Sequence, residues 1–132
     1  MTHSVILGTG SYVPDEVLAN SDLEKIVDTT DQWIFDRTGI RERRVAQPEA
    51  AASDLSLPAS QRALEAAGMD PKEIDLIIVT TLTPDSLCPS TACWLQAEIG
   101  AERAAAFDMN AACSGFVYGV QVADAYIRSG LK

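Results

Sequence analysis

The sequence predicts a layered α/β fold with a partly parallel sheet. "IDLIIVTTLT" (74–83) is a near-continuous run of apolar, β-branched residues, which is typical of a strand buried on both faces. "AAAFDMN" (104–110) is a second candidate buried strand, and helical segments separate and follow the two. A length of 132 residues is typical of a single domain, and a hydrophobic content of 47% suffices to form a core. We therefore expect one α/β domain over 1–132.

Turn formers and helix caps divide the residues before position 50 into short elements. These are a strand over 4–14 that ends in a glycine turn, a helix over 21–27 capped by Asn20, a helix over 31–37 capped by Thr30 and ended by Gly39, and a short strand or extended segment over 40–46. Apolar and charged residues alternate in the last of these, which indicates one solvent-exposed face.

The spacing of apolar residues between Ser53 and Ala67 predicts a helix that Gly68 ends. Pro58 conflicts with this prediction, because a proline inside a helix removes a backbone hydrogen bond and clashes with the preceding turn. Either the helix starts later, with Pro58 in its first turn, or it kinks there.

Two further helices follow the buried strands. "PDSLCP" (84–89) is a loop, after which Pro89 is placed as the first residue of a helix that Gly100 ends. The second helix covers 113–129 and ends at Gly130, and its apolar residues cover most of its circumference, so we expect it to be buried. Because the chain stops after this helix, we expect the sheet to be incomplete.

Composition excludes several classes of function. Nineteen acidic residues against ten basic ones give a net charge of −9, which argues against a nucleic-acid-binding protein. The sequence contains neither a signal peptide nor a run long enough to span a membrane, so we expect a soluble, cytoplasmic, reduced protein. Three cysteines (Cys88, Cys93 and Cys113) without a C-x-x-C pair are poor evidence for a disulfide framework or a metal site.

Cys113 is the strongest candidate for chemistry. It lies where a buried strand is followed at once by a helix, among small residues, in "NAACSGF" (110–116). A helix N-terminus stabilises a thiolate, and the Cys113 N–H could point at a developing oxyanion. The alternative is a buried, inert thiol, because free cysteine is among the most buried residue types. The single histidine, His3, is expected to be an exposed terminal residue and not a catalytic base.

Four stretches together resemble one protein family. They are "GTGSYVP" (8–14), "DTTDQWIFDRTGIRERR" (28–44), "PSTACWLQAEIG" (89–100) and "FDMNAACSGF" (107–116). In this combination the chain resembles the N-terminal part of the β-ketoacyl-acyl-carrier-protein synthase III family, of the thiolase superfamily. The resemblance runs over nearly the whole chain.

The resemblance implies a thiolase fold, a homodimer, and a decarboxylating Claisen condensation that starts fatty-acid synthesis. It makes Cys113 the nucleophile that takes an acyl group from acyl-coenzyme A, a substrate and not a resident cofactor, before condensation with malonyl-acyl-carrier protein. It places Trp33 and Arg37 at the adenine end of coenzyme A, with Thr29 as a further contact. An indole offers a flat face to a purine, and a guanidinium can stack or pair with phosphate.

The sequence departs from the family pattern in two ways. The histidine and asparagine that assist the family's cysteine belong to a second half, which this sequence lacks, so we expect the isolated 132 residues to be inactive and prone to associate. Many bacterial members also have phenylalanine where Cys88 stands, in a loop that reaches the partner subunit's acyl pocket. Our hypothesis is that the smaller Cys88 admits an acyl group bulkier than acetyl; Cys93 is expected only to pack.

Other interpretations remain open at this level. The motifs equally suit a related polyketide-type or quinolone-type condensing enzyme, because substrate choice depends on pocket shape. A non-catalytic thiolase-fold piece that dimerises or binds coenzyme A is the alternative from another class. "RERR" (41–44) is either a basic rim for phosphate or the carrier protein, or simply a solvated charged strand.

Overall fold

The computed structural model describes residues 3–131, which form two compact units. One unit consists of residues 3–12 together with 51–131, and the other of residues 13–50. Each is described by itself below.

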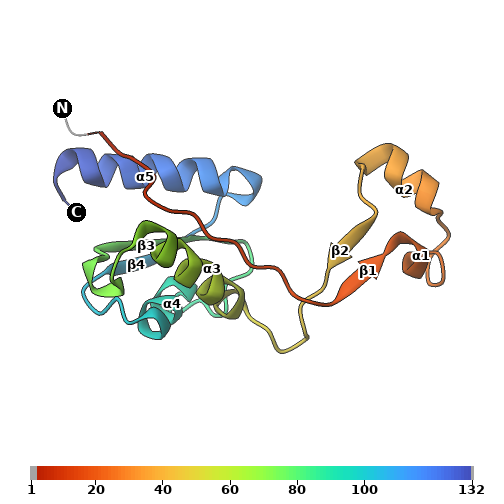
Figure 1. Ribbon diagram of the computed structural model, residues 1–132, viewed down its shortest axis with the longest axis horizontal. Helices are drawn as coiled ribbons and strands as arrows, with labels where there is room; N and C mark the ends of the chain where they lie inside the picture. The colour runs from red at the N-terminus through yellow and green to blue at the C-terminus, as the bar shows by residue number, and fades with distance from the viewer. Residues whose placement is uncertain (1–2, 132) are drawn as a thin grey trace. The chain divides into compact units, whose positions relative to one another are not determined.

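The larger unit is built on a parallel pair of strands between helices (Figure 1). Strands β3 (Leu76–Thr80) and β4 (Ala105–Met109) pair in parallel, with Leu76 opposite Ala105. Helix α4 contacts both strands on one side, and α5 packs against β3 on the other. The remaining elements complete the unit: α3 (Ala52–Ala67), η1 (Pro71–Glu73), α4 (Thr91–Ile99), η2 (Ala112–Ser114) and α5 (Gly115–Ser129). The predicted parallel α/β arrangement is confirmed.

The smaller unit pairs two short strands and two helices. Strand β1 (Val17–Ala19), which the sequence pattern did not reveal, runs antiparallel to β2 (Glu42–Arg44). Helix α2 (Asp31–Thr38) begins and ends as predicted, because the Thr30 hydroxyl accepts the Trp33 N–H and Gly39 adopts a φ of 69°.

Asn20 does not cap the short helix α1 (Asn20–Leu23), so that prediction was wrong. Its side chain is 1% exposed and donates to the Asp31 carboxylate at 2.7 Å and to the Ile40 carbonyl oxygen at 2.8 Å. Its own oxygen accepts from Arg43 at 2.7 Å. Asn20 is therefore the buried polar centre of this unit, because all its hydrogen-bonding groups find partners there.

Two predictions about prolines need correction or refinement. Pro58 lies inside α3, so the helix does not start after it, while Gly68 ends the helix as predicted with a φ of 64°. Pro89 is not the first residue of α4. Ser90 caps that helix by accepting the Cys93 N–H at 3.3 Å, because a serine hydroxyl can accept where proline offers no such group.

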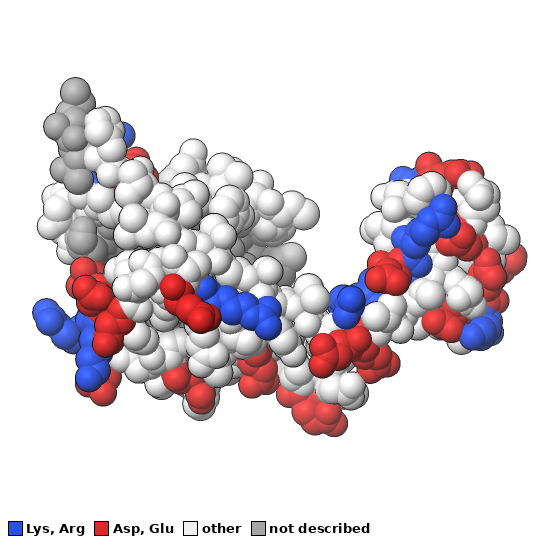
Figure 2. Space-filling model, viewed as in Figure 1, with Lys and Arg blue, Asp and Glu red and all other residues white. Residues whose placement is uncertain are grey.

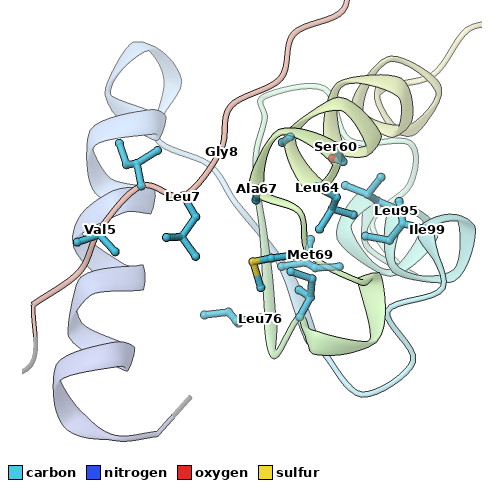
Figure 3. Close-up of a pocket in the computed structure, with 14 residues that line it drawn as sticks. Val5, Leu7, Gly8, Ser60, Leu64, Ala67, Met69, Leu76, Leu95 and Ile99 are labelled. Carbon is cyan, nitrogen blue, oxygen red and sulfur yellow. The ribbon is translucent and has the colours of Figure 1, made fainter.

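The strand predicted over 4–14 is absent: residues 3–14 carry no regular secondary structure. The segment instead runs against α3, where Gly8 and Gly10 allow its backbone to come close. A Cβ on Gly8 would lie 2.5 Å from the Ala63 carbonyl oxygen. Between residues 5–8, α3 and the sheet lies an apolar cavity of about 430 Å³ (Figure 3), and none of the predicted site residues lines it.

Helix α5 is not buried all round, contrary to the prediction. Of its residues only Gly115 is buried, and Phe116 is 74% exposed. Within residues 3–131 the helix packs on β3 and also contacts the irregular N-terminal segment, whose Ser4 hydroxyl donates to Asp124 at 2.7 Å, and these contacts leave much of its surface exposed. Gly130 ends it as predicted, with a φ of 72°. No helix within these residues is long and apolar enough to cross a membrane.

Candidate active site

Cys113 lies in the tight turn η2, between the end of β4 and the start of α5. Among residues 3–131 its side chain is exposed, unlike that of a core cysteine. No side chain caps the first turn of α5, and the Gly115 N–H, two residues after the thiol, donates to the Ala112 carbonyl oxygen. The N-terminal end of a helix carries partial positive charge, so Cys113 lies beside an end of α5 that attracts negatively charged groups.

The backbone on either side of Cys113 is tightly constrained. Ala112 has a φ of 47°, in the left-handed region that an alanine adopts only at some cost. On the other side, a Cβ on Gly115 would lie 3.1 Å from the Thr80 Cβ, and one on Gly119 would lie 3.0 Å from the Thr80 Cγ2. The absence of these side chains lets α5 approach β3 closely and so fixes the start of the helix.

A polar network that sequence reasoning missed lies beside this turn. The Asp108 carboxylate accepts the backbone N–H groups of Thr91 and Ala92, each at 2.8 Å. The fully buried Thr91 hydroxyl contacts Asp85, donating to its carboxylate at 3.2 Å and accepting its N–H at 3.0 Å. The Asp85 carboxylate also accepts the N–H and hydroxyl of Ser53. Burial raises the pKa of Asp85, but these hydrogen bonds together outweigh burial and leave the pKa below its usual value.

The residues predicted to bind the nucleotide all belong to the unit of residues 13–50. The Arg37 guanidinium lies over the Trp33 ring, 4.2 Å from its centroid, and the indole is 53% exposed. The Thr29 Oγ1 atom is buried and has no hydrogen-bond partner. Among the described residues, no other buried side-chain N or O atom lacks one. This unit thus carries a half-exposed indole with a guanidinium stacked on it, and a buried hydroxyl without a hydrogen-bond partner.

The basic segment 41–44 is largely engaged within its own unit. Arg41 pairs with Asp31 at 2.9 Å, Arg43 donates to Asn20, and Arg44 donates to the Pro14 carbonyl oxygen at 3.2 Å. Acidic and basic side chains intermingle on the face of the protein in Figure 2. These contacts favour the interpretation of 41–44 as a charged strand with structural roles.

The structure describes the predicted site residues in two groups, with Cys113 in one unit and Thr29, Trp33 and Arg37 in the other. His3 is exposed, as expected, and Cys93 is half-buried, with its thiol 3.9 Å from the Ala106 carbonyl oxygen. Within residues 3–131 no three His, Cys, Asp or Glu side chains are grouped to hold a metal ion.

Comparison with known proteins finds relatives of the chain in one family. The model for 3-oxoacyl-[acyl-carrier-protein] synthase III matches residues 107–132, which include Cys113. A β-ketoacyl-[acyl-carrier-protein] synthase III of Caldanaerobacter subterraneus subsp. tengcongensis is 56% identical over 126 residues, covering 96% of this chain and 38% of that protein. One of Xanthomonas oryzae pv. oryzae is 59% identical over 128 residues, covering 97% and 39%. Over nearly its whole length, the chain matches the N-terminal part of synthase III.

Solved structures of synthase III agree with this match. The enzyme of Aquifex aeolicus VF5 superimposes with a TM-score of 0.91 at 53% identity, over 95% of this chain and 40% of that one. The priming β-ketosynthase of the R1128 polyketide pathway also gives a TM-score of 0.91, at 42% identity, over 95% and 37%. These neighbours confirm the predicted thiolase-like α/β fold and the resemblance to the family's N-terminal part. The chain spans about two fifths of the length of these relatives.

Proposed function

We propose that this chain carries the nucleophile of a condensing enzyme that starts fatty-acid synthesis. The Cys113 thiolate attacks the thioester carbonyl of an acyl-coenzyme A, and the coenzyme A thiolate leaves and takes up a proton. Malonyl-acyl-carrier protein then loses carbon dioxide, and its carbanion attacks the acyl-Cys113 thioester. The 3-oxoacyl-acyl-carrier protein departs and the thiolate is restored. The observation that carries this proposal is the exposed Cys113 beside the uncapped start of α5, within a matched family segment.

The proposal extends to the nucleotide and the assembly. Trp33 and Arg37 would bind the adenine end of acyl-coenzyme A, and the unpartnered Thr29 Oγ1 would supply a hydrogen bond. We further propose that residues 1–132 are one thiolase-like domain of a cytoplasmic homodimer, that no resident cofactor takes part, and that the histidine and asparagine partners come from residues outside this sequence.

Peptide mass spectrometry tests the central proposal. The protein, at its natural full length, is incubated with acetyl-coenzyme A and, separately, with hexanoyl-coenzyme A, and the tryptic peptide of residues 104–128 is then analysed, because it contains Cys113 without the other cysteines. We expect one added acetyl or hexanoyl group on that peptide. A Cys113 that stays unmodified after prolonged incubation with each ester would contradict the condensing function and favour a non-catalytic coenzyme A-binding or dimerisation role.

Replacing Trp33 with alanine is expected to raise the Kd for coenzyme A by about tenfold to a hundredfold, because a base stacked on an aromatic ring contributes roughly 1–3 kcal/mol. Isothermal titration calorimetry measures this directly. Trp94, which is similarly exposed at 47%, supplies the matched control: Trp94→Ala should leave the Kd unchanged. Equal weakening in both variants would refute the assignment of Trp33.

The exposed Cys88 leads to an expectation about substrate choice. If its small side chain leaves room in the partner subunit's acyl pocket, straight or branched acyl-coenzyme A esters longer than acetyl should compete effectively for Cys113. Competition between acetyl-coenzyme A and these esters measures the preference, and Cys88→Phe should shift it about tenfold toward acetyl, the factor expected from excluding one or two methylenes. Strict preference for acetyl-coenzyme A in the unchanged protein would contradict this hypothesis.

A polyketide-priming role is the second candidate. It is favoured by the R1128 priming β-ketosynthase, which matches this chain as closely in TM-score as the Aquifex synthase does. Condensation assays with malonyl groups carried on a fatty-acid carrier protein and on a polyketide carrier protein separate the two, because each candidate should turn over its own carrier protein faster.

A further inference from the structure

The Asp108 carboxylate joins two segments that are distant in sequence. Asp108 is the penultimate residue of strand β4, and its carboxylate accepts the N–H groups of Thr91 and Ala92, both at 2.8 Å. These are the first two residues of α4, and both are fully buried. Hydrogen bonds to a carboxylate are roughly twice as strong as neutral ones, so this contact holds the start of α4 firmly to the end of β4.

Hydrogen bonds connect the two ends of the loop of residues 81–90 to two adjacent residues of β4. At its start, the Thr81 N–H donates to the Met109 carbonyl oxygen at 3.2 Å. At its end, the Thr91 N–H donates to Asp108. The loop is thus closed on the two strand residues that precede the turn into the thiol.

Between these two hydrogen bonds, the tip of the loop is exposed to solvent. Leu87 is 97% exposed and Cys88 is exposed as well. Only four residues separate Asp108 from Cys113 along the chain. The end of β4 therefore both holds the loop by hydrogen bonds and continues into the turn that carries the thiol. A displacement of that strand end would move the loop tip and Cys113 together.

We propose that Asp108 is a positioning residue that fixes the 81–90 loop to the strand end leading to Cys113, and so helps to set which acyl groups fit the partner subunit's acyl pocket. The statement about acyl groups rests on the proposed function; the statement about coupling does not. Asp85 supports the arrangement from the other side, because its carboxylate binds both Thr91 and Ser53 of α3.

Asp108→Asn is the test, in the protein at its natural full length. The asparagine side chain has one carbonyl oxygen, which can still accept one of the two backbone N–H groups. Its NH₂ group cannot accept the other, so one of the two hydrogen bonds is lost. The matched control is Asp70→Asn, because Asp70 also caps a helical turn of this unit, accepting the Lys72 N–H at 2.9 Å, but does not touch β4. The readouts are the acylation rates of Cys113 with acetyl-coenzyme A and hexanoyl-coenzyme A, and hydrogen exchange at Thr91 and Ala92.

We expect Asp108→Asn to speed exchange at Thr91 and Ala92 and to change the ratio of the two acylation rates by roughly tenfold, which corresponds to about 1.4 kcal/mol. Asp70→Asn should leave both unchanged. If Asp108→Asn lowers both acylation rates equally, with a ratio that matches the control, Asp108 only stabilises the fold and the proposal is overturned.

Two further arms keep the result interpretable. If the unchanged protein takes no acyl group on Cys113, the proposed function has failed, and the coupling is judged by the rate of iodoacetamide alkylation of Cys113: a change of roughly tenfold in Asp108→Asn alone supports it, and no change overturns it. If Asp108→Asn does not fold, Asp85→Asn loosens the same loop from the side of α3. An unaltered acylation ratio and an unaltered alkylation rate in that variant would likewise overturn the proposal.

Discussion

Cys113→Ala should reduce condensing turnover by about a thousandfold or more in the protein at its natural full length, while coenzyme A binding is retained. The reason is that the acyl group has no other acceptor in the proposed reaction, and loss of a nucleophile removes a covalent step that no neighbouring group replaces. Because Cys113 is exposed and its side chain is small, the substitution opens no cavity. The melting temperature should therefore stay close to that of the unchanged protein.

Cys88→Ala and Cys93→Ala are the matched controls for this experiment. Cys88 is exposed on a loop, and Cys93 is half-buried with its thiol near the Ala106 carbonyl oxygen. Neither should lose turnover by more than a small factor. Full turnover in Cys113→Ala, or equal loss in Cys93→Ala, would show that Cys113 is not the nucleophile.

Gly10→Ala should produce the largest loss of stability of any glycine-to-alanine substitution in the described residues. The added Cβ would overlap the Ala59 carbonyl oxygen and lie 2.5 Å from the Ala63 N atom, both of which are backbone atoms of α3. Backbone cannot move aside as a flexible side chain can, so the segment of residues 3–12 would have to leave the helix. We expect a cost of roughly 3 kcal/mol or more, at the upper end of the range for overpacking.

Gly68→Ala separates this steric effect from ordinary glycine strain. Gly68 ends the same helix with a φ of 64°, but a Cβ there would meet nothing within 4 Å. The control should cost only about 1 kcal/mol, from the left-handed backbone alone. Thermal unfolding followed by circular dichroism compares the two variants. A melting temperature for Gly10→Ala at or above that of Gly68→Ala would refute the close packing of the N-terminal segment.

The elements that depend on local chemistry were predictable from the sequence. Strand β3 follows from an apolar, β-branched run and β4 from a short apolar run, although their residues are half-buried or exposed and not fully buried as predicted, and the ends of α2, α3, α4 and α5 follow from glycines that adopt positive φ. Features that depend on distant residues were not. Asn20 looks like a cap until Asp31, Ile40 and Arg43 surround it. The apolar circumference of α5 indicates burial but cannot say which residues would cover it.

The candidate site shows the same division. Cys113 could be found because the small residues around it and the strand-to-helix change are local signals, and the family motif adds specificity. Asp108 could not be singled out, because an aspartate at the end of a strand has no pattern that names Thr91 and Ala92 as its partners. The exposure of Cys113 and the unpartnered Thr29 Oγ1 likewise emerge only once the chain is folded.

The stacking of Arg37 over Trp33 gives this surface an optical signal of its own. Indole fluorescence responds to the charge and polarity of whatever lies on the ring, and here that is a guanidinium 4.2 Å from the centroid. A molecule that takes over the ring face displaces this cation and alters the emission. The sequence contains only one other tryptophan, Trp94, on α4, so a Trp94→Phe background isolates the signal. Occupancy of the surface can then be followed in real time, without a label and without waiting for any reaction at Cys113.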